Sequence, residues 1–189
     1  MVRTWLRVIV CLFIASSIAS ADVIVLDDGN LVLGPNGETD VYQPKGKHTW
    51  VTPDGRTVTT TTDKPIVVSS GEGTIEILTG PGNSRVAIDW PVLPPAPWGY
   101  TDLAVDVIWI DGTYNVLWDN DYLLGVLDGP GRHIWTMPDL RVGGGGTLIF
   151  KTSDGGDIVI DDIEVISVPE PSIFALPFEV FELLMQLTI

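Results

Sequence analysis

Residues 145–167 read GGTLIFKTSDGGDIVIDDIEVIS, and this stretch decides the fold. Two runs rich in β-branched residues flank the turn sequence Ser153-Asp154-Gly155-Gly156. Such runs favour strands, and a short Asp- and Gly-containing connection between them favours a hairpin. The stretch therefore predicts two antiparallel strands, at residues 147–152 and 157–166.

Runs of the same kind extend back to residue 23, each bounded by Gly, Pro, Asn or Asp, and helix signals are nearly absent between residues 22 and 168. Many short strands with turn signals between them predict an all-β sandwich or barrel. The other predicted strands are residues 23–26, 31–33, 57–62, 66–68, 74–78, 85–90, 103–110, 114–118, 123–127 and 133–136.

The first 21 residues have the pattern of a secretory signal peptide. Arg3 and Arg7 precede an apolar run at residues 8–18, which is too short for a comfortable membrane span. Ala19 and Ala21 then form the small-x-small pattern that signal peptidase cleaves. We expect the export machinery to handle the chain and cleavage to follow Ala21. The alternative is an uncleaved N-terminal membrane helix.

Export would leave an acidic chain without cysteine. The only cysteine, Cys11, lies in the signal, so the mature protein has neither disulfides nor thiol chemistry. Loss of Arg3 and Arg7 leaves 8 basic residues against 25 acidic ones. Such a charge repels phosphate backbones and excludes nucleic acid as an expected partner.

The two halves of the mature chain, about 22–90 and 100–167, resemble each other across a proline-rich connection at 91–99. Gly46-Lys47-His48-Thr49-Trp50 corresponds to Gly131-Arg132-His133-Ile134-Trp135. In a strand, residues i and i+2 share a face, so each histidine is expected beside its tryptophan. We interpret the echo as a repeated structural element within one domain, 22–167. Paired ligands or a catalytic base are the alternative.

The end of the chain carries a short motif. Val168-Pro169-Glu170-Pro171-Ser172 precedes an apolar tail to residue 189, and this combination resembles the sorting signal of PEP-CTERM proteins. The resemblance implies processing at Pro169, Glu170 and Pro171 by an exosortase-type enzyme, and a place at the cell surface or in the exopolysaccharide matrix. The strand before the motif resembles the closing strand of galactose-binding-like jelly rolls, which implies a jelly-roll-like antiparallel sandwich.

The tail at 168–189 departs from that family in its charges. It contains Glu179 and Glu182, and no Arg or Lys follows Lys151. Carboxylates are costly in hydrocarbon, and the basic cluster that fixes orientation is missing. A short apolar helix that contacts the membrane at its surface is one interpretation, and a helix packed on the sandwich is another.

Calcium is the cofactor that the acidic residues favour. Asp119, Asn120 and Asp121 place three oxygen side chains in one turn, as hard cations require. Asp161 and Asp162 lie on the last strand and are expected to point to opposite faces, one of them inward. The resemblance to jelly-roll carbohydrate-binding modules implies that such an acid helps to hold a structural calcium. Ordinary turn and surface acids are the alternative.

Aromatic residues indicate a binding role, because sugar rings stack on exposed aromatic faces. Trp98 and Tyr100 lie at the proline-rich connection, and Trp118 borders the Asp-Asn-Asp turn, so we expect these three to bind carbohydrate. Trp109 and Trp135 lie in apolar strands and are expected in the core.

The sequence contains no nucleophile motif and no phosphate-binding glycine loop, so we expect no enzyme. The leading hypothesis is an exported surface or matrix protein that binds polysaccharide through a calcium-stabilised sandwich. A purely structural surface protein and a secreted glycan-active hydrolase are the alternatives.

Overall fold

The structure is a computed structural model of the 189-residue chain. It describes residues 23–27, 33–71, 73–90, 100–119, 121–137 and 145–167. The predicted signal helix and the apolar tail with its Pro-Glu-Pro motif lie outside these residues, as do 91–99. In the part that is described, no helix is long and apolar enough to cross a bilayer.

The only regular secondary structure of the described residues is the β-strand, and all of these strands belong to one compact unit, Val23–Val168. The strands of the first half are β1 (Val23–Asp27), β2 (Asp40–Gln43), β3 (Gly46–Val51), β4 (Thr57–Thr62), β5 (Ile66–Gly71), β6 (Thr74–Leu78) and β7 (Ser84–Trp90). Those of the second half are β8 (Tyr100–Gly112), β9 (Tyr114–Trp118), β10 (Tyr122–Leu127), β11 (Gly131–Thr136), β12 (Gly146–Thr152) and β13 (Gly156–Ser167).

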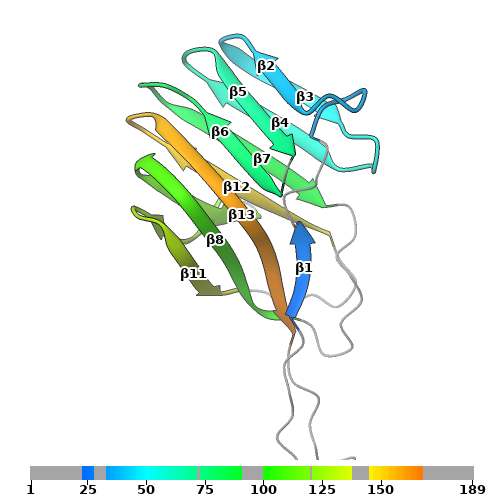
Figure 1. Ribbon diagram of the computed structural model, residues 1–189, viewed down its shortest axis with the longest axis vertical. Helices are drawn as coiled ribbons and strands as arrows, with labels where there is room; N and C mark the ends of the chain where they lie inside the picture. The colour runs from blue at the N-terminus through cyan, green and yellow to red at the C-terminus, as the bar shows by residue number, and fades with distance from the viewer. Residues whose placement is uncertain are drawn as a thin grey trace, which may run out of the picture. The chain divides into compact units, whose positions relative to one another are not determined.

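Two antiparallel sheets pack face to face. The seven-stranded sheet has the order β11-β8-β13-β6-β5-β2, with β1 also paired to β13, and the six-stranded sheet has the order β10-β9-β12-β7-β4-β3. Figure 1 shows β11, β8, β13, β6, β5 and β2 side by side in one layer, with β12 and β7 behind them. The all-β, jelly-roll-like antiparallel sandwich is therefore confirmed. Of the strand predicted at 31–33 the structure describes only Leu33, and this residue is not in a strand. Strands β2 and β3 were not predicted.

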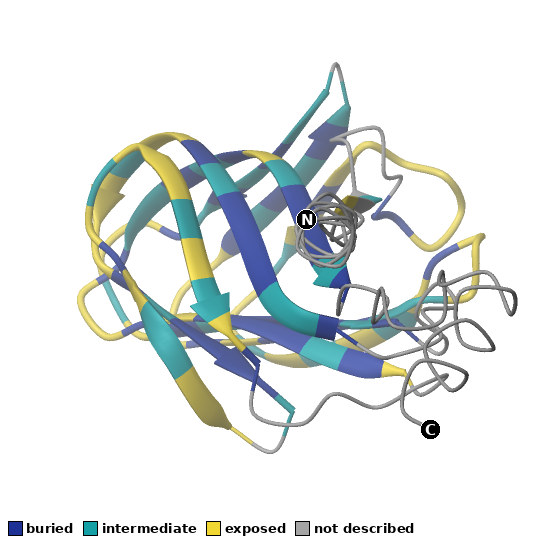
Figure 2. Ribbon diagram, turned by 90° about the horizontal axis from the view of Figure 1, so that it is seen from below, coloured by how far each residue is buried: buried dark blue, intermediate teal, exposed yellow. Residues whose placement is uncertain are grey.

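The core lies between the two inner faces. Side chains of β5 and β6 alternate between the core and the outside, so each strand buries every second one. Figure 2 shows buried and less buried residues alternating along several strands. The apolar sequence pattern thus becomes a continuous buried cluster fed by both sheets. Its largest fully buried side chains include Tyr100, Tyr114, Phe150, Leu103 and Leu148.

Two glycines make room for tryptophans. A Cβ atom on Gly146 would lie 2.1 Å from Cζ2 of Trp118, and one on Gly125 would lie 2.0 Å from Nε1 of Trp135. Each indole therefore occupies the space above a neighbouring backbone. Trp135 lies on β11 and Gly125 lies on β10, and these are edge strands of different sheets. The contact between the indole and Gly125 therefore links the two sheets at this edge.

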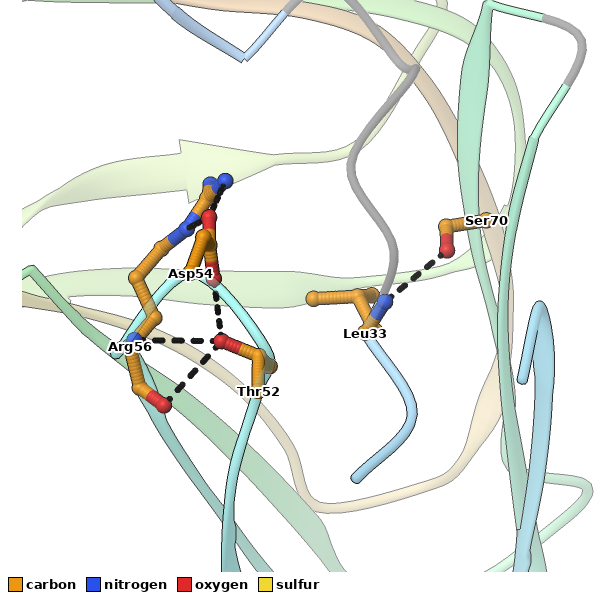
Figure 3. Close-up of polar contacts among 5 residues, drawn as sticks. All are labelled: Leu33, Thr52, Asp54, Arg56 and Ser70. Atoms are coloured by element: carbon orange, nitrogen blue, oxygen red, sulfur yellow. Dashed lines mark hydrogen bonds and ion pairs between the residues drawn. The ribbon is translucent and has the colours of Figure 1, made fainter. Parts of the chain in front are cut away.

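The opposite edge of the sandwich is closed by Leu33. Its amide donates to Oγ of Ser70 on β5 at 3.2 Å, and its carbonyl accepts from Nε1 of Trp50 on β3 at 2.6 Å. Leu33 is fully buried and is held by both sheets at once. Figure 3 draws its hydrogen bond to Ser70. Each tryptophan of the sequence echo therefore lies at an edge where the two sheets meet.

The turn between β3 and β4 is held by a local polar network, also drawn in Figure 3. Arg56 donates to Oδ2 of Asp54 at 2.5 Å, and Thr52 donates to the same carboxylate. Burial alone would raise the pKa of Asp54, but the hydrogen bond from Thr52 and the charge of Arg56 hold it below its usual value. The guanidinium also lies 5.9 Å from the ring centroid of Trp90, which fixes the turn against the core.

We predict that Gly146→Ala lowers the free energy of unfolding by about 1–3 kcal/mol, because Trp118 must move or the backbone must shift. Urea unfolding measures the change. Gly129→Ala is the matched control: no atom lies within 4 Å of the added Cβ, so its effect should stay within about 0.5 kcal/mol. Equal stability of the two variants would show that the indole of Trp118 does not need the space above Gly146.

We predict that stability falls in alkali because of Tyr114. Burial raises the pKa of this phenol to about 12 from its ordinary value of 10, and its hydroxyl donates to the carbonyl of Gly156 at 2.7 Å. Between these two values the unfolded chain loses the proton while the folded chain keeps it. The stabilisation is therefore complete below pH 10 and declines by about 2–3 kcal/mol as the pH rises to 12.

Urea unfolding of the wild type and of Tyr114→Phe between pH 8 and pH 12 measures this decline. The stability difference between the two proteins should shrink across the window, because the variant has no phenol to ionise. A difference that stays constant from pH 8 to pH 12 would contradict the assignment.

Candidate functional site

The pairing of β8 with β13 has three register shifts, and two of them are bulges that shape the outer face of the seven-stranded sheet. Trp109 pairs with Val159, but the next pair is Val107 with Ile160, so Ile108 is an extra residue on β8. A bulge of this kind rotates side chains locally. Ile108 and Trp109 consequently both lie outside, with 52% and 48% of their surface exposed.

The second bulge lies in β13 and controls two acids. Ile160 pairs with Val107 and Ile163 pairs with Val105, so Asp161 and Asp162 together oppose a single residue, Asp106. The isoleucines before and after them are fully buried, whereas Asp161 is exposed and Asp162 is half-buried. The prediction that one of the two aspartates points inward is wrong, because the bulge turns both away from the core.

The register of the sheet places the outward side chains in two adjacent rows across the strands β8, β13, β6, β5 and β2. We call this pair of rows the outer-face platform. The first row is Trp109, Val159, Glu76, Ser69 and Asp40, and the second row is Asp111, Asp157, Leu78, Val67 and Tyr42.

The two aromatic residues of the platform lie at opposite ends. Trp109 is on β8 and Tyr42 is on β2, where 64% of its surface is exposed. Four inter-strand steps separate these strands, which corresponds to about 19 Å. Between the two rings the platform offers carboxylates, a serine and aliphatic side chains, so it combines apolar faces with hydrogen-bond acceptors.

A cluster of three carboxylates lies beside the platform on β8 and β13. Carboxylate oxygens of Asp106, Asp162 and Glu164 all lie within 4.8 Å of one another. Arg132, on the neighbouring strand β11, donates to Asp106 at 2.5 Å and also to Glu164. The hydrogen bond to Glu164 raises the pKa of Arg132, so the guanidinium is a fixed counter-charge for the cluster.

Stacking on a sugar requires an exposed ring, and two of the three residues predicted to stack are buried. Trp98 lies outside the described residues. Tyr100 and Trp118 are 1% and 3% exposed and belong to the core cluster, so neither ring offers a face to a ligand. The structure corrects the expectation for these two, because alternation along β8 and β9 turns them inward. It also corrects the expectation for Trp109, which lies outside, while Trp135 packs on the core as expected.

Asp119 and Asp121, which were predicted to bind metal, each have another partner in the structure. Asp119 accepts a hydrogen bond from the Thr147 amide at 2.8 Å, and Asp121 forms an ion pair with Arg85 at 3.2 Å. Both aspartates have positive φ, 34° and 63°, which fits their role in a tight turn. Asn120 lies outside the described residues. Calcium binding stays a prediction, and among the predicted ligands only Asp162 belongs to a group of three carboxylates.

The two histidines lie on edge strands, His48 on β3 and His133 on β11. The ring of His133 stacks on that of Trp135 with centroids 5.9 Å apart, as the shared strand face predicted, and its Nε2 contacts the carbonyl of Gly129 at 3.0 Å. His48 and Trp50 share the inner face of β3. The strands that carry them differ in partner, since β3 pairs with the following strand β4 and β11 pairs with the earlier strand β8. The two similar sequence segments therefore both form edge strands, but they pair with the rest of the fold in different ways.

Sequence reasoning missed both aromatic residues of the outer-face platform. Tyr42 belongs to the short edge strand β2, which was not predicted at all. Trp109 lies in the run VIWI (residues 107–110), and uniform hydrophobicity gives no signal for a bulge. The acidic residues that recur along the two strands, three on β8 and four on β13, were the available sign that this face is exposed.

Solved structures of carbohydrate-binding modules of family 29 are similar to this chain. A mutant of one such module has 15% sequence identity and a TM-score of 0.47, with 78% of this chain and 93% of the module covered. A CBM29-2 mutant complexed with mannohexaose has 13% identity and a TM-score of 0.45, with 78% and 93% covered. Another CBM29-2 mutant, complexed with cellulohexaose, has 13% identity and a TM-score of 0.44, with 79% and 94% covered.

No family model and no curated protein matches the chain. A likeness to solved structures at such identities and TM-scores assigns neither a ligand nor a residue role to this chain. The candidate site therefore rests on the outer-face platform itself.

We predict that Arg132→Met lowers the free energy of unfolding by about 1–2 kcal/mol at neutral pH, because three close carboxylates lose their counter-charge. Urea unfolding at pH 7 measures the loss. Arg85→Met is the control, since its ion pair with Asp121 is exposed and should contribute less than about 0.5 kcal/mol. Equal losses in both variants would contradict the cluster.

Proposed function

We propose that this protein is an exported, non-enzymatic glycan-binding protein that holds a polysaccharide across its outer-face platform. The observation that carries the proposal is the exposure of Trp109 and Tyr42 on one open sheet face. Large aromatic side chains are ordinarily buried where a core is available, and exposed ones on a regular surface favour a binding role. Both strands bury neighbouring residues in the core, so the fold had inward positions for such rings.

The geometry of the platform suits an extended chain of sugar rings. An aromatic face packs against the C–H face of a sugar ring, and two such faces about 19 Å apart would hold two rings of one oligosaccharide. A row of outward side chains along a sheet admits the interior of a long polymer as readily as its end. The platform therefore favours a polysaccharide over a single small sugar.

Polar side chains between the two rings supply hydrogen bonds. Glu76, Ser69 and Asp40 share the row of Trp109, and their oxygen atoms accept from hydroxyl groups. These residues are held by paired β-strands, so their spacing is set before a ligand arrives. A backbone fixed in this way loses little conformational freedom on binding, which favours affinity.

The proposed location follows from the two ends of the chain. The signal-peptide pattern supports export, and the resemblance of Pro169-Glu170-Pro171 and its tail to a PEP-CTERM signal supports delivery to the cell surface or matrix. A glycan-binding domain in that setting would attach the protein to extracellular polysaccharide. A structural surface protein without a ligand remains the alternative, and it predicts no glycan binding at all.

A glycan array followed by calorimetry tests the proposal. We predict that Trp109→Ala and Tyr42→Ala each weaken the affinity for the bound glycan about tenfold, since each removes one stacking surface worth about 1.4 kcal/mol. Tyr122→Ala is the matched control, because Tyr122 is 53% exposed on β10 of the other sheet. Its affinity should equal that of the wild type.

Absence of binding to every glycan would refute the proposal and favour the structural alternative. Undiminished affinity in both Trp109→Ala and Tyr42→Ala would place any binding elsewhere on the molecule. Release of reducing ends from a bound glycan would favour the hydrolase alternative.

A further inference from the structure

The two sheets of the sandwich carry opposite charge. Among the side chains that the structure describes, the strands of the six-stranded sheet hold three cations, Lys47, Arg85 and Lys151, and one acid, Asp89. The strands of the seven-stranded sheet hold a single Lys or Arg, Arg132. Their nine described acids are Asp40, Glu76, Asp102, Asp106, Asp111, Asp157, Asp161, Asp162 and Glu164. The negative charge of the strands is therefore concentrated on one face.

The acids of this sheet project outward because the inward positions are apolar. Glu76 lies between the buried residues Ile75 and Ile77, and Asp157 precedes the buried Ile158. Arg132 is engaged with Asp106 and Glu164 in the carboxylate cluster, outside the outer-face platform. Neither row of the platform contains Lys or Arg.

Four carboxylates thus surround the aromatic residues of the platform without a cation among them. Glu76 and Asp40 share the row of Trp109, while Asp111 and Asp157 share the row of Tyr42. A polysaccharide with carboxylate or sulfate groups would meet like charge at each of these strands. A neutral polysaccharide would gain only stacking and ordinary hydrogen bonds.

We propose, on the basis of the proposed function, that the ligand of the outer-face platform is a polysaccharide of amino sugars with free, protonated amino groups. Ammonium groups along such a polymer complement Glu76, Asp40, Asp111 and Asp157, and an ammonium hydrogen bond to a carboxylate is stronger than a neutral one. The same groups gain from the electron-rich face of Trp109. Charge complementarity of this kind selects among ligands of similar shape.

Calorimetry with four hexasaccharides in a chelator-containing buffer at pH 6 tests the inference. The ligands are the hexamers of glucosamine, N-acetylglucosamine, glucose in β-1,4 linkage and galacturonate. The glucosamine hexamer should bind at least about tenfold more tightly than its acetylated form, and the galacturonate hexamer should bind most weakly. The preference should decrease between 0.05 M and 1 M salt, because the screening length falls to about 3 Å at 1 M.

Charge variants locate the effect. Glu76→Gln combined with Asp111→Asn should weaken binding of the glucosamine hexamer about tenfold and leave binding of the acetylated hexamer within twofold. Asp63→Asn combined with Asp154→Asn removes the same number of charges from exposed turns outside the platform and should change neither affinity more than twofold. Thermal melting of all proteins shows that each variant is folded.

The outcomes separate the two levels of the proposal. Equal affinity for the glucosamine and acetylated hexamers would overturn the preference for amino sugars and leave glycan binding intact. Equal losses in the platform variant and the turn variant would also overturn it, because net charge alone would then explain the binding. Failure of all four hexamers to bind, together with an empty glycan array, would overturn the proposed function as well.

Discussion

The pairing of β8 with β13 is the constraint on which the rest of the structure depends. These are the longest strands of the fold, and β13 also pairs with β6 and β1, so this pairing forms the centre of the seven-stranded sheet. One bulge adds a residue to β8 and the next adds one to β13. The first exposes Ile108 and Trp109, and the second turns Asp161 and Asp162 outward. A regular ladder would have sent one member of each pair into the core.

The six-stranded sheet and the edges stabilise what this pairing presents. Gly146 and Gly125 allow Trp118 and Trp135 to fill the interior, while Trp50 and Ser70 bind Leu33 between the sheets. A sandwich without disulfides depends on such packing, because burial of apolar area is its main source of stability. With the interior filled in this way, the exposed ring of Trp109 contributes little to the core, which is why its position points to function.

The sequence predicted the regular parts of this structure and missed the irregular ones. Alternating β-branched runs located β4, β6 and β9 to the residue, since period-two burial is a local property. Strands β2 and β3 were missed because their short runs, DVYQ and GKHTWV, mix polar with apolar residues, and because β2 pairs with β5 rather than with a neighbouring strand in the chain. Tyr100, Trp118 and Trp109 were assigned to the wrong side because inward or outward orientation depends on register, and a bulge changes register without a local signature. The acids were recognised as important, but their concentration on one sheet appears only when the strands are ordered.

The proposed function rests on the contrast between the two outer faces. One carries few charges, mainly positive, and the other carries two exposed aromatic rings among carboxylates. The most direct measurement is a two-dimensional NMR titration of the isotope-labelled protein with the glucosamine hexamer. We expect shifts of the Trp109 indole N–H and of backbone amides in β8, β13, β6, β5 and β2, and no shifts in β3, β4, β7 and β12. Shifts confined to the six-stranded sheet, or none with any glycan, would contradict it.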